Sequence, residues 1–179
     1  MKRFFKGIIA ILGCAVIFAG CNNEPNTVAQ ETAPTTPALS GATAARSEGF
    51  SPVLWGNTVR LGQDIYEVLD MLGEPMYTFE QPSCAFEGID RFFLFGGVQI
   101  QTYPAANGQD LVHTVMLTDD SVATASGIHL GSSLASVLAA YGNDYEYAFG
   151  LYIFTHGATT LRFLVTDDMV TSISYELLV

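Results

Sequence analysis

The sequence predicts an α+β fold in which a short helix followed by an antiparallel sheet of three or four strands occurs twice in tandem. The first observation is an internal similarity: the segment from Val59 to Gly73 matches the segment from Ile128 to Gly142 at a constant offset of 69 residues. The second is that apolar residues in both segments recur at i, i+3, i+4 and i+7, which defines one face of a short helix. The third is that alternating apolar and polar residues, typical of strands, follow each segment.

Both predicted helices carry start and stop signals. Their apolar faces are Ile65, Val68, Leu69 and Leu72 in the first, and Leu134, Val137, Leu138 and Tyr141 in the second. Gln63 or Asp64 can cap the first helix, and Ser132 or Ser133 the second, because their side chains accept hydrogen bonds from free amides. Gly73 and Gly142 are suited to end them.

Strand-like runs follow both helices. The predicted strands are Phe92 to Phe95, Val98 to Tyr103, Leu111 to Thr118, Tyr145 to Phe149, Leu151 to Phe154, Thr160 to Val165 and Val170 to Leu177. The stretch from Tyr77 to Asp90 is a loop or an added strand. Each half, about 57–122 and 126–179, is too small for a secure core of its own. We therefore expect the halves to share one continuous sheet or to pack as a pair.

The N-terminus has the pattern of an export signal. Lys2, Arg3 and Lys6 precede an apolar run from Ile8 to Ala19, which is shorter than the about 20 residues that span a bilayer. The following Phe18-Ala19-Gly20-Cys21 resembles the lipobox of bacterial lipoproteins, which implies cleavage before Cys21 and acylation of its thiol. Ile11-Leu12-Gly13-Cys14 is an alternative lipobox, and a plain signal peptide or an uncleaved anchor is a second alternative.

The predicted organisation has three parts: a signal peptide at 1–20, the lipidated cysteine with a disordered tether at 21–52, and a folded domain at 53–179. Between Asn22 and Gly49, the only apolar residues besides alanine are Val28 and Leu39, so this stretch cannot bury enough surface to order itself. Two acyl chains on Cys21 would hold the protein on the extracytoplasmic face of a cell membrane.

The charge of the chain restricts its partners. Without the signal peptide, four arginines face 18 acidic residues, a formal charge of −14. Such a body repels phosphate backbones and anionic lipid surfaces, so nucleic acid is excluded as a main partner. We expect the membrane to be reached through the anchor alone.

No catalytic, metal-binding or cofactor-binding pattern is evident, and the chain is predicted not to be an enzyme. His113, His129 and His156 are not at metal-ligand spacing. The sequence also lacks the Gly-x-Ser-x-Gly motif of many hydrolases. The pairs Asp119-Asp120 and Asp167-Asp168 are interpreted as solvated turn residues, with a calcium site as the alternative. Cys84 has no partner in the mature chain; it is interpreted as a small buried residue, with a reactive thiol as the alternative.

Non-catalytic binding therefore remains the expected activity. Aromatic residues make up 12% of the chain, and a few of them on an exposed sheet face would make a binding surface. Gln99, Gln101 and Tyr103 alternate along one predicted strand and Arg162 lies on another, and these four are the candidate binding residues. The dense aromatic group from Tyr141 to Phe154 is expected to pack mostly in the core or on a sheet.

A resemblance supports the same expectation. Val68-Leu69-Asp70-Met71-Leu72-Gly73-Glu74-Pro75, with a looser copy at Val137 to Gly142, is similar to the helix signature of two groups of proteins. These are the β-lactamase-inhibitor-protein-like fold and the SmpA/OmlA (BamE) lipoproteins of outer-membrane assembly. The chain also looks like uncharacterised lipoproteins of Gram-positive anaerobes.

The resemblance implies that a sheet face or its rim binds another protein, although Cys84 has no counterpart to the inhibitors' disulfides. The sequence thus predicts a membrane-anchored, protein-binding module of the cell envelope, with no cofactor. The alternatives are an inhibitor or modulator of an envelope hydrolase and a small-ligand-binding lipoprotein.

Overall fold

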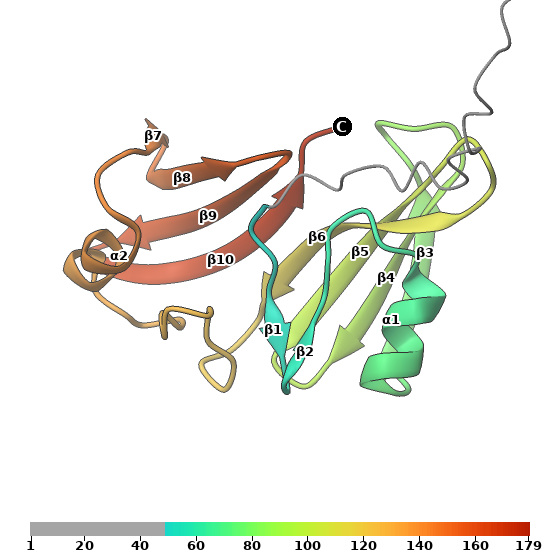
Figure 1. The fold of residues 1–179 in the computed structure, drawn as a ribbon, viewed down its shortest axis with the longest axis horizontal. Coiled ribbons are helices and arrows are strands. Elements are labelled where there is room, and N and C mark those ends of the chain that lie inside the picture. The colour runs from blue at the N-terminus through green and yellow to red at the C-terminus, as the bar shows by residue number, and fades with distance from the viewer. Residues whose placement is uncertain (1–48) are drawn as a thin grey trace, which may run out of the picture. The chain divides into compact units, whose positions relative to one another are not determined.

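The computed structural model describes residues 49–179, which form one large antiparallel sheet, a small two-stranded sheet and two short helices (Figure 1). The predicted signal peptide, Cys21 and nearly all of the predicted tether lie outside the described residues. The elements in chain order are β1 (Val53–Leu54), β2 (Asn57–Thr58), α1 (Ile65–Leu72), β3 (Tyr77–Pro82), β4 (Ile89–Phe95), β5 (Val98–Pro104), β6 (Asp110–Leu117), α2 (Leu134–Tyr141), β7 (Glu146–Ala148), β8 (Leu151–His156), β9 (Thr159–Thr166) and β10 (Met169–Leu177).

The large sheet has eight strands in the order β3-β4-β5-β6-β10-β9-β8-β7. Two series of hairpins, β3 to β6 and β7 to β10, meet where β6 pairs with β10. In this antiparallel pair Leu117 lies opposite Ile173, and Val115 lies opposite Tyr175. Of the two arrangements that the sequence left open, the structure therefore has the continuous sheet.

The predicted fold class, however, is wrong. The described chain is mainly β, with two helices of eight residues beside ten strands, and it is not a tandem of helix-plus-sheet repeats. The repeated helix pattern is real, but it covers only a small part of the chain. The eight strands pair into a single sheet because β6 and β10 bond to each other and leave no boundary between two smaller sheets.

The two helices lie where the apolar spacing predicts them. Asp64 caps α1 by accepting a hydrogen bond from the backbone N–H of Tyr66 at 2.9 Å. Ser133 caps α2 in the same way, accepting from the N–H of Ser136 at 3.2 Å. Each helix ends at a glycine with positive φ, Gly73 and Gly142, a conformation that favours glycine.

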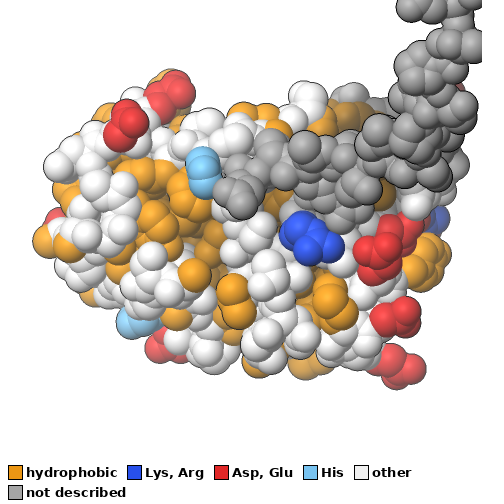
Figure 2. Space-filling view, viewed as in Figure 1, with side chains coloured by type: hydrophobic (Ala, Val, Ile, Leu, Met, Phe, Trp, Pro, Cys, Tyr) orange, Lys and Arg blue, Asp and Glu red, His pale blue; other side chains and the backbone are white. Residues whose placement is uncertain are grey.

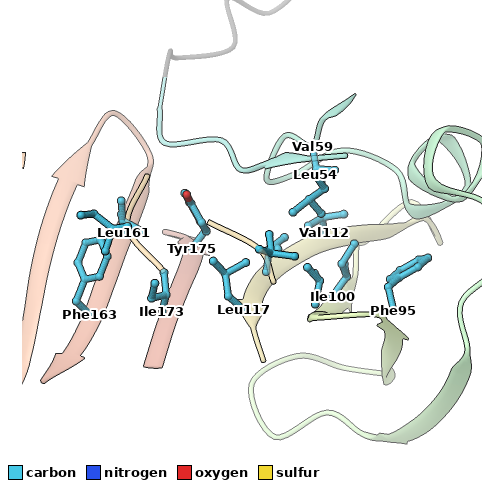
Figure 3. Close-up of a cluster of buried hydrophobic side chains, with 14 of the residues drawn as sticks. Leu54, Val59, Phe95, Ile100, Val112, Leu117, Leu161, Phe163, Ile173 and Tyr175 are labelled. Atoms are coloured by element: carbon cyan, nitrogen blue, oxygen red, sulfur yellow. The ribbon is translucent and has the colours of Figure 1, made fainter. Parts of the chain in front are cut away.

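One face of the large sheet carries the hydrophobic core. α1, α2 and the β1–β2 hairpin contribute side chains to this face, and the core runs across strands of both hairpin series (Figure 3). Its fully buried side chains include Leu54 and Val59 near the small sheet, Ile100 on β5, and Phe163 and Ile173 on β9 and β10. Burial of these apolar surfaces is the main favourable contribution to folding.

A charged cluster holds β3, β4 and β6 together at one end of the sheet. Arg91 on β4 donates to Glu80 on β3 at 2.7 Å and to Asp110 on β6, whose side chain is largely buried. The hydrogen bond to Glu80 is the main reason why the pKa of Arg91 is raised; burial opposes this effect and the charge of Asp110 adds to it. The cluster thus links β4 to its neighbour β3 and, across β5, to β6.

One edge strand of the sheet is short, and the other ends at a proline. β7 has three residues, and β3 ends at Pro82, which has no N–H to donate. The sheet is paired along all its other strands.

Candidate functional site

The sheet face opposite the core, here called the outer face, is the surface that the candidate residues share. Antiparallel register places one residue of each strand in a row across it: Tyr77, Leu94, Gln99, Met116, Ser174, Arg162, Ile153 and Glu146. Every member of the row is exposed or half-buried. The helices and the small sheet pack on the opposite side with the core, so among the described elements none of these covers the outer face.

The four candidate binding residues all lie on this outer face. Gln99, Gln101 and Tyr103 alternate along β5 with Ile100 and Thr102, which are fully buried in the core. Arg162 shares the row of Gln99 but is three strands away, which is about 14 Å at ordinary strand spacing. The structure therefore brings the four residues to one surface but not into one pocket.

Arg162 is engaged within the sheet. Its guanidinium forms an ion pair with Glu176 of β10 at 2.6 Å, and its Nε donates to Thr160 Oγ1 at 3.2 Å. The side chains of Arg162 and Glu176 are each about one quarter exposed. A partly exposed pair of this kind adds little to stability because water screens both charges, so it remains a polar feature that a partner can contact.

Asp90 contributes an unsatisfied acceptor beside the glutamines. Gln101 Nε2 donates to Asp90 Oδ2 at 3.5 Å, a long hydrogen bond. The other carboxylate oxygen, Oδ1, is buried and has no hydrogen-bond partner among the described residues. A buried polar atom without a partner is costly. Because this oxygen has almost no exposed surface, it lowers stability locally and is not a contact point for a second molecule.

Aromatic side chains occupy the β3–β5 end of the outer face. Phe79 and Phe92 stack with ring centroids 4.4 Å apart, and Tyr77 lies 6.2 Å from Phe79. Phe86, in the loop between β3 and β4, lies 4.9 Å from Tyr103. The face thus combines an aromatic end with a polar centre.

The sequence did not place Phe79 and His113 on this face. The stretch containing Phe79, for which the sequence predicts either a loop or an added strand, forms the edge strand β3. His113 lies where the pairing of β5 with β6 shifts, and its ring is 5.8 Å from that of Tyr103. The alternation of Phe79 with polar neighbours is a sequence signal for the strand β3. The register shift at His113 has no such signal in the sequence.

Among residues 49–179, the other candidate groups do not gather into a metal site. His113 lies on β6, His129 precedes α2 and His156 ends β8, and no three His, Cys, Asp or Glu side chains in this part gather as metal ligands. Asp167 and Asp168 form the β9–β10 turn, as predicted. The prediction that Cys84 is buried is wrong: it is exposed in the β3–β4 loop because no core element covers that loop.

The aromatic group between Tyr141 and Phe154 divides into packed and exposed members. Tyr141 and Phe154 join the core cluster on the opposite side of the sheet, with ring centroids 5.5 Å apart. Hydrophobic side chains accordingly gather over the part of the sheet near α2 (Figure 2). Phe149, at the β7–β8 turn, is 99% exposed, so the expectation of packing fails for this residue because the turn extends beyond the sheet.

Comparison with known proteins gives no family. No family model matches the chain, and no curated protein matches it. A solved structure of an extracellular protein containing a SCP domain, from Bacillus anthracis str. Ames, superposes with a TM-score of 0.39 at 13% identity, covering 65% of this chain and 43% of that chain. A likeness at this level carries no argument about fold or function. Within residues 49–179, no helix is long and apolar enough to cross a membrane.

Proposed function

We propose that the protein is an extracytoplasmic lipoprotein, anchored through Cys21, whose outer face binds another protein of the cell envelope without catalysis. The observation that carries this proposal is a wide sheet face on which aromatic, amide and charged side chains are half-exposed together. Export and anchoring are supported by the basic start, the apolar run and the lipobox-like Phe18-Ala19-Gly20-Cys21.

The size of the outer face suits a protein partner. Eight strands at ordinary spacing extend about 34 Å, and three rows of side chains along the strands extend about 20 Å. The product, roughly 700 Å², is close to the about 800 Å² that one partner buries in a standard protein interface. A surface of this size fits a folded protein better than a small molecule.

The charge of the domain indicates the character of the partner. Residues 49–179 carry three arginines and 15 acidic residues, a net charge of −12. The only cation of the row, Arg162, is already paired with Glu176. A partner with a basic surface therefore matches the outer face in charge.

Site-specific cross-linking in intact cells tests the proposal. A photo-reactive residue is placed at Gln99 or Gln101, and at Tyr66 as control, because Tyr66 is 66% exposed on α1 on the opposite side of the sheet. We expect one discrete adduct from the two glutamine positions and none from Tyr66. The captured protein must also bind the purified chain, and Gln101→Arg must weaken this binding. Adducts of equal yield from Tyr66, or no effect of Gln101→Arg, would refute the outer face as the interface.

The anchor has its own test. Mass spectrometry of the N-terminal peptide from membranes is expected to show acylated Cys21, and Cys21→Ala is expected to release the protein from the membrane. An unmodified Cys21 in membrane-bound protein would contradict the proposed anchor while leaving the binding face untouched.

A further inference from the structure

A cavity on the core side of the sheet carries a second inference. Its volume is about 620 Å³, within the range of small-molecule sites. Three parts of the chain line it: Gly49 and Ser51 at the N-terminal start of the described residues, the segment from Thr58 to Gln63, and the β8–β9 turn from His156 to Thr159 with Leu177 beside it. These parts are far apart in the sequence.

The walls of this cavity are held by hydrogen bonds independent of any ligand. The N–H of Phe50 donates to Thr159 Oγ1 at 2.6 Å, and Thr159 Oγ1 donates to the carbonyl of His156 at 3.0 Å. On the other side, the N–H of Gly62 donates to the carbonyl of Val112 on β6 at 2.7 Å. A site whose walls are already ordered loses little entropy when a ligand binds.

The charge of the cavity is opposite to that of the domain. Arg60 and His156 are among its lining residues, and none of the described lining residues is acidic. Of the three arginines in residues 49–179, Arg91 and Arg162 are bound to acidic partners, whereas Arg60 is exposed and forms no ion pair with another described residue. A guanidinium with free donors is a preferred partner of carboxylates.

The rest of the lining defines what else the ligand needs. Leu61, Ala158 and Leu177 are apolar, while Ser51 and Thr58 offer hydroxyls. Gln63 is itself engaged: its Nε2 donates to Glu67 at 3.1 Å, and its Oε1 accepts from the backbone N–H of Arg60 at 3.2 Å. One permanent positive charge beside apolar walls matches a single negative charge on a partly apolar molecule.

From this arrangement we infer that the cavity binds a small carboxylate with an apolar body, in which Arg60 contacts the carboxylate and Leu61 and Leu177 contact the apolar part. The ligand is a monoanion because a phosphate dianion would require a second permanent cation. The inference is independent of the outer face, since Thr159 and Leu177 lie on the same side of the sheet as the buried Leu161 and Tyr175.

The test is a titration of the purified mature chain with small probe molecules, in which NMR of the backbone amides detects binding. The probes are hexanoate, hexylamine, 1-hexanol and hexyl phosphate. We expect hexanoate to shift the amide signals of Gly62 and Thr159, and hexylamine and 1-hexanol to leave them unchanged. Longer alkanoates are expected to bind more tightly, by up to about fourfold for each added methylene until the cavity is full.

Two arginine variants form the matched comparison. Arg60→Gln is expected to weaken hexanoate binding about tenfold or more, because a charge-assisted hydrogen bond is lost. Arg162→Gln removes the same charge on the outer face and is expected to change binding less than about twofold. Because Arg60 is exposed and its guanidinium bonds to no other described residue, Arg60→Gln should keep its unfolding midpoint, which circular dichroism checks.

Each opposing result would overturn the inference. Absence of hexanoate binding, equal binding of hexylamine, or equal loss in Arg162→Gln would show that Arg60 does not define a carboxylate site. Tighter binding of hexyl phosphate than of hexanoate would replace the carboxylate by another anion class. Failure to find a protein partner in the cross-linking experiment would contradict only the proposed function of the outer face and would leave the carboxylate site standing.

Discussion

Replacement of Phe163 by alanine tests whether the eight strands form one cooperative unit. Phe163 lies on β9, is fully buried, and its ring centroid is 5.4 Å from that of Tyr141 and 5.9 Å from that of Phe154. Truncating a phenylalanine in such a site costs about 3–5 kcal/mol, because apolar contact is lost and a cavity remains. Since a domain is stable by roughly 5–15 kcal/mol, the unfolding temperature should fall by roughly 10–20 °C.

The assay uses two probes at different places in the sheet. Trp55, the only tryptophan in the chain, lies in the small sheet with its ring centroid 6.1 Å from that of Phe95 on β4. Its fluorescence therefore reports on the β3–β6 side, while far-ultraviolet circular dichroism reports on all strands. Because β6 and β10 join both sides, Phe163→Ala should lower the two transitions by the same amount.

The control is Phe149→Ala, which removes an equally large side chain from a position that is 99% exposed. We expect its two transitions to stay within about 0.5 kcal/mol of the wild type. If Phe163→Ala shifted the circular dichroism but left the Trp55 transition in place, the two sides would unfold separately. The argument for a single cooperative core would then fail.

Three further predictions concern pH, a turn and a helix end. Burial raises the pKa of Tyr175 far above its usual value, so the hydroxyl loses its proton at lower pH in the unfolded chain than in the folded one. The free energy of unfolding should therefore fall as pH rises above about 10. Urea denaturation at several pH values measures this fall, and Tyr175→Phe should remove the part that Tyr175 causes. Gly97→Ala should lower the free energy of unfolding by about 1–3 kcal/mol, because φ is +79° and the new Cβ would lie 2.6 Å from Ser121 Oγ. Gly108→Ala, at φ +81° with no atom within 4 Å of the new Cβ, should lower it less. Equal losses of stability in denaturant unfolding would contradict the clash at Gly97. Ser133→Ala should cost about 1 kcal/mol, since α2 loses its capping hydrogen bond, and an unchanged midpoint would show that the cap adds nothing.

Local signals in the sequence were sufficient for the helices and most strands. The apolar spacing at Ile65 and Val68, and the caps Asp64 and Ser133, are properties of neighbouring residues, and the structure has them where they were expected. The fold class was wrong because it depends on the pairing of β6 with β10, which are far apart in the chain. Periodicity within a strand carries no information about the strand beside it.

The same distinction applies to the two candidate sites. Alternation along β5 was enough to place Gln99, Gln101 and Tyr103 on one face. The cavity around Arg60 could not be predicted, because it is formed where Gly49 and Ser51 meet the β8–β9 turn, which is far away in the sequence. Nothing in the sequence beside Arg60 marks that meeting point.

The two edges of the sheet have a consequence for how copies of the protein meet. An open strand edge can pair with the edge of another copy, and the proposed anchor would bring such copies together on one surface. Here β7 offers three residues, and β3 ends at Pro82 and carries Glu80. A three-residue edge and a proline-ended edge that carries a charge disfavour strand addition and the fibrous aggregation that can follow it.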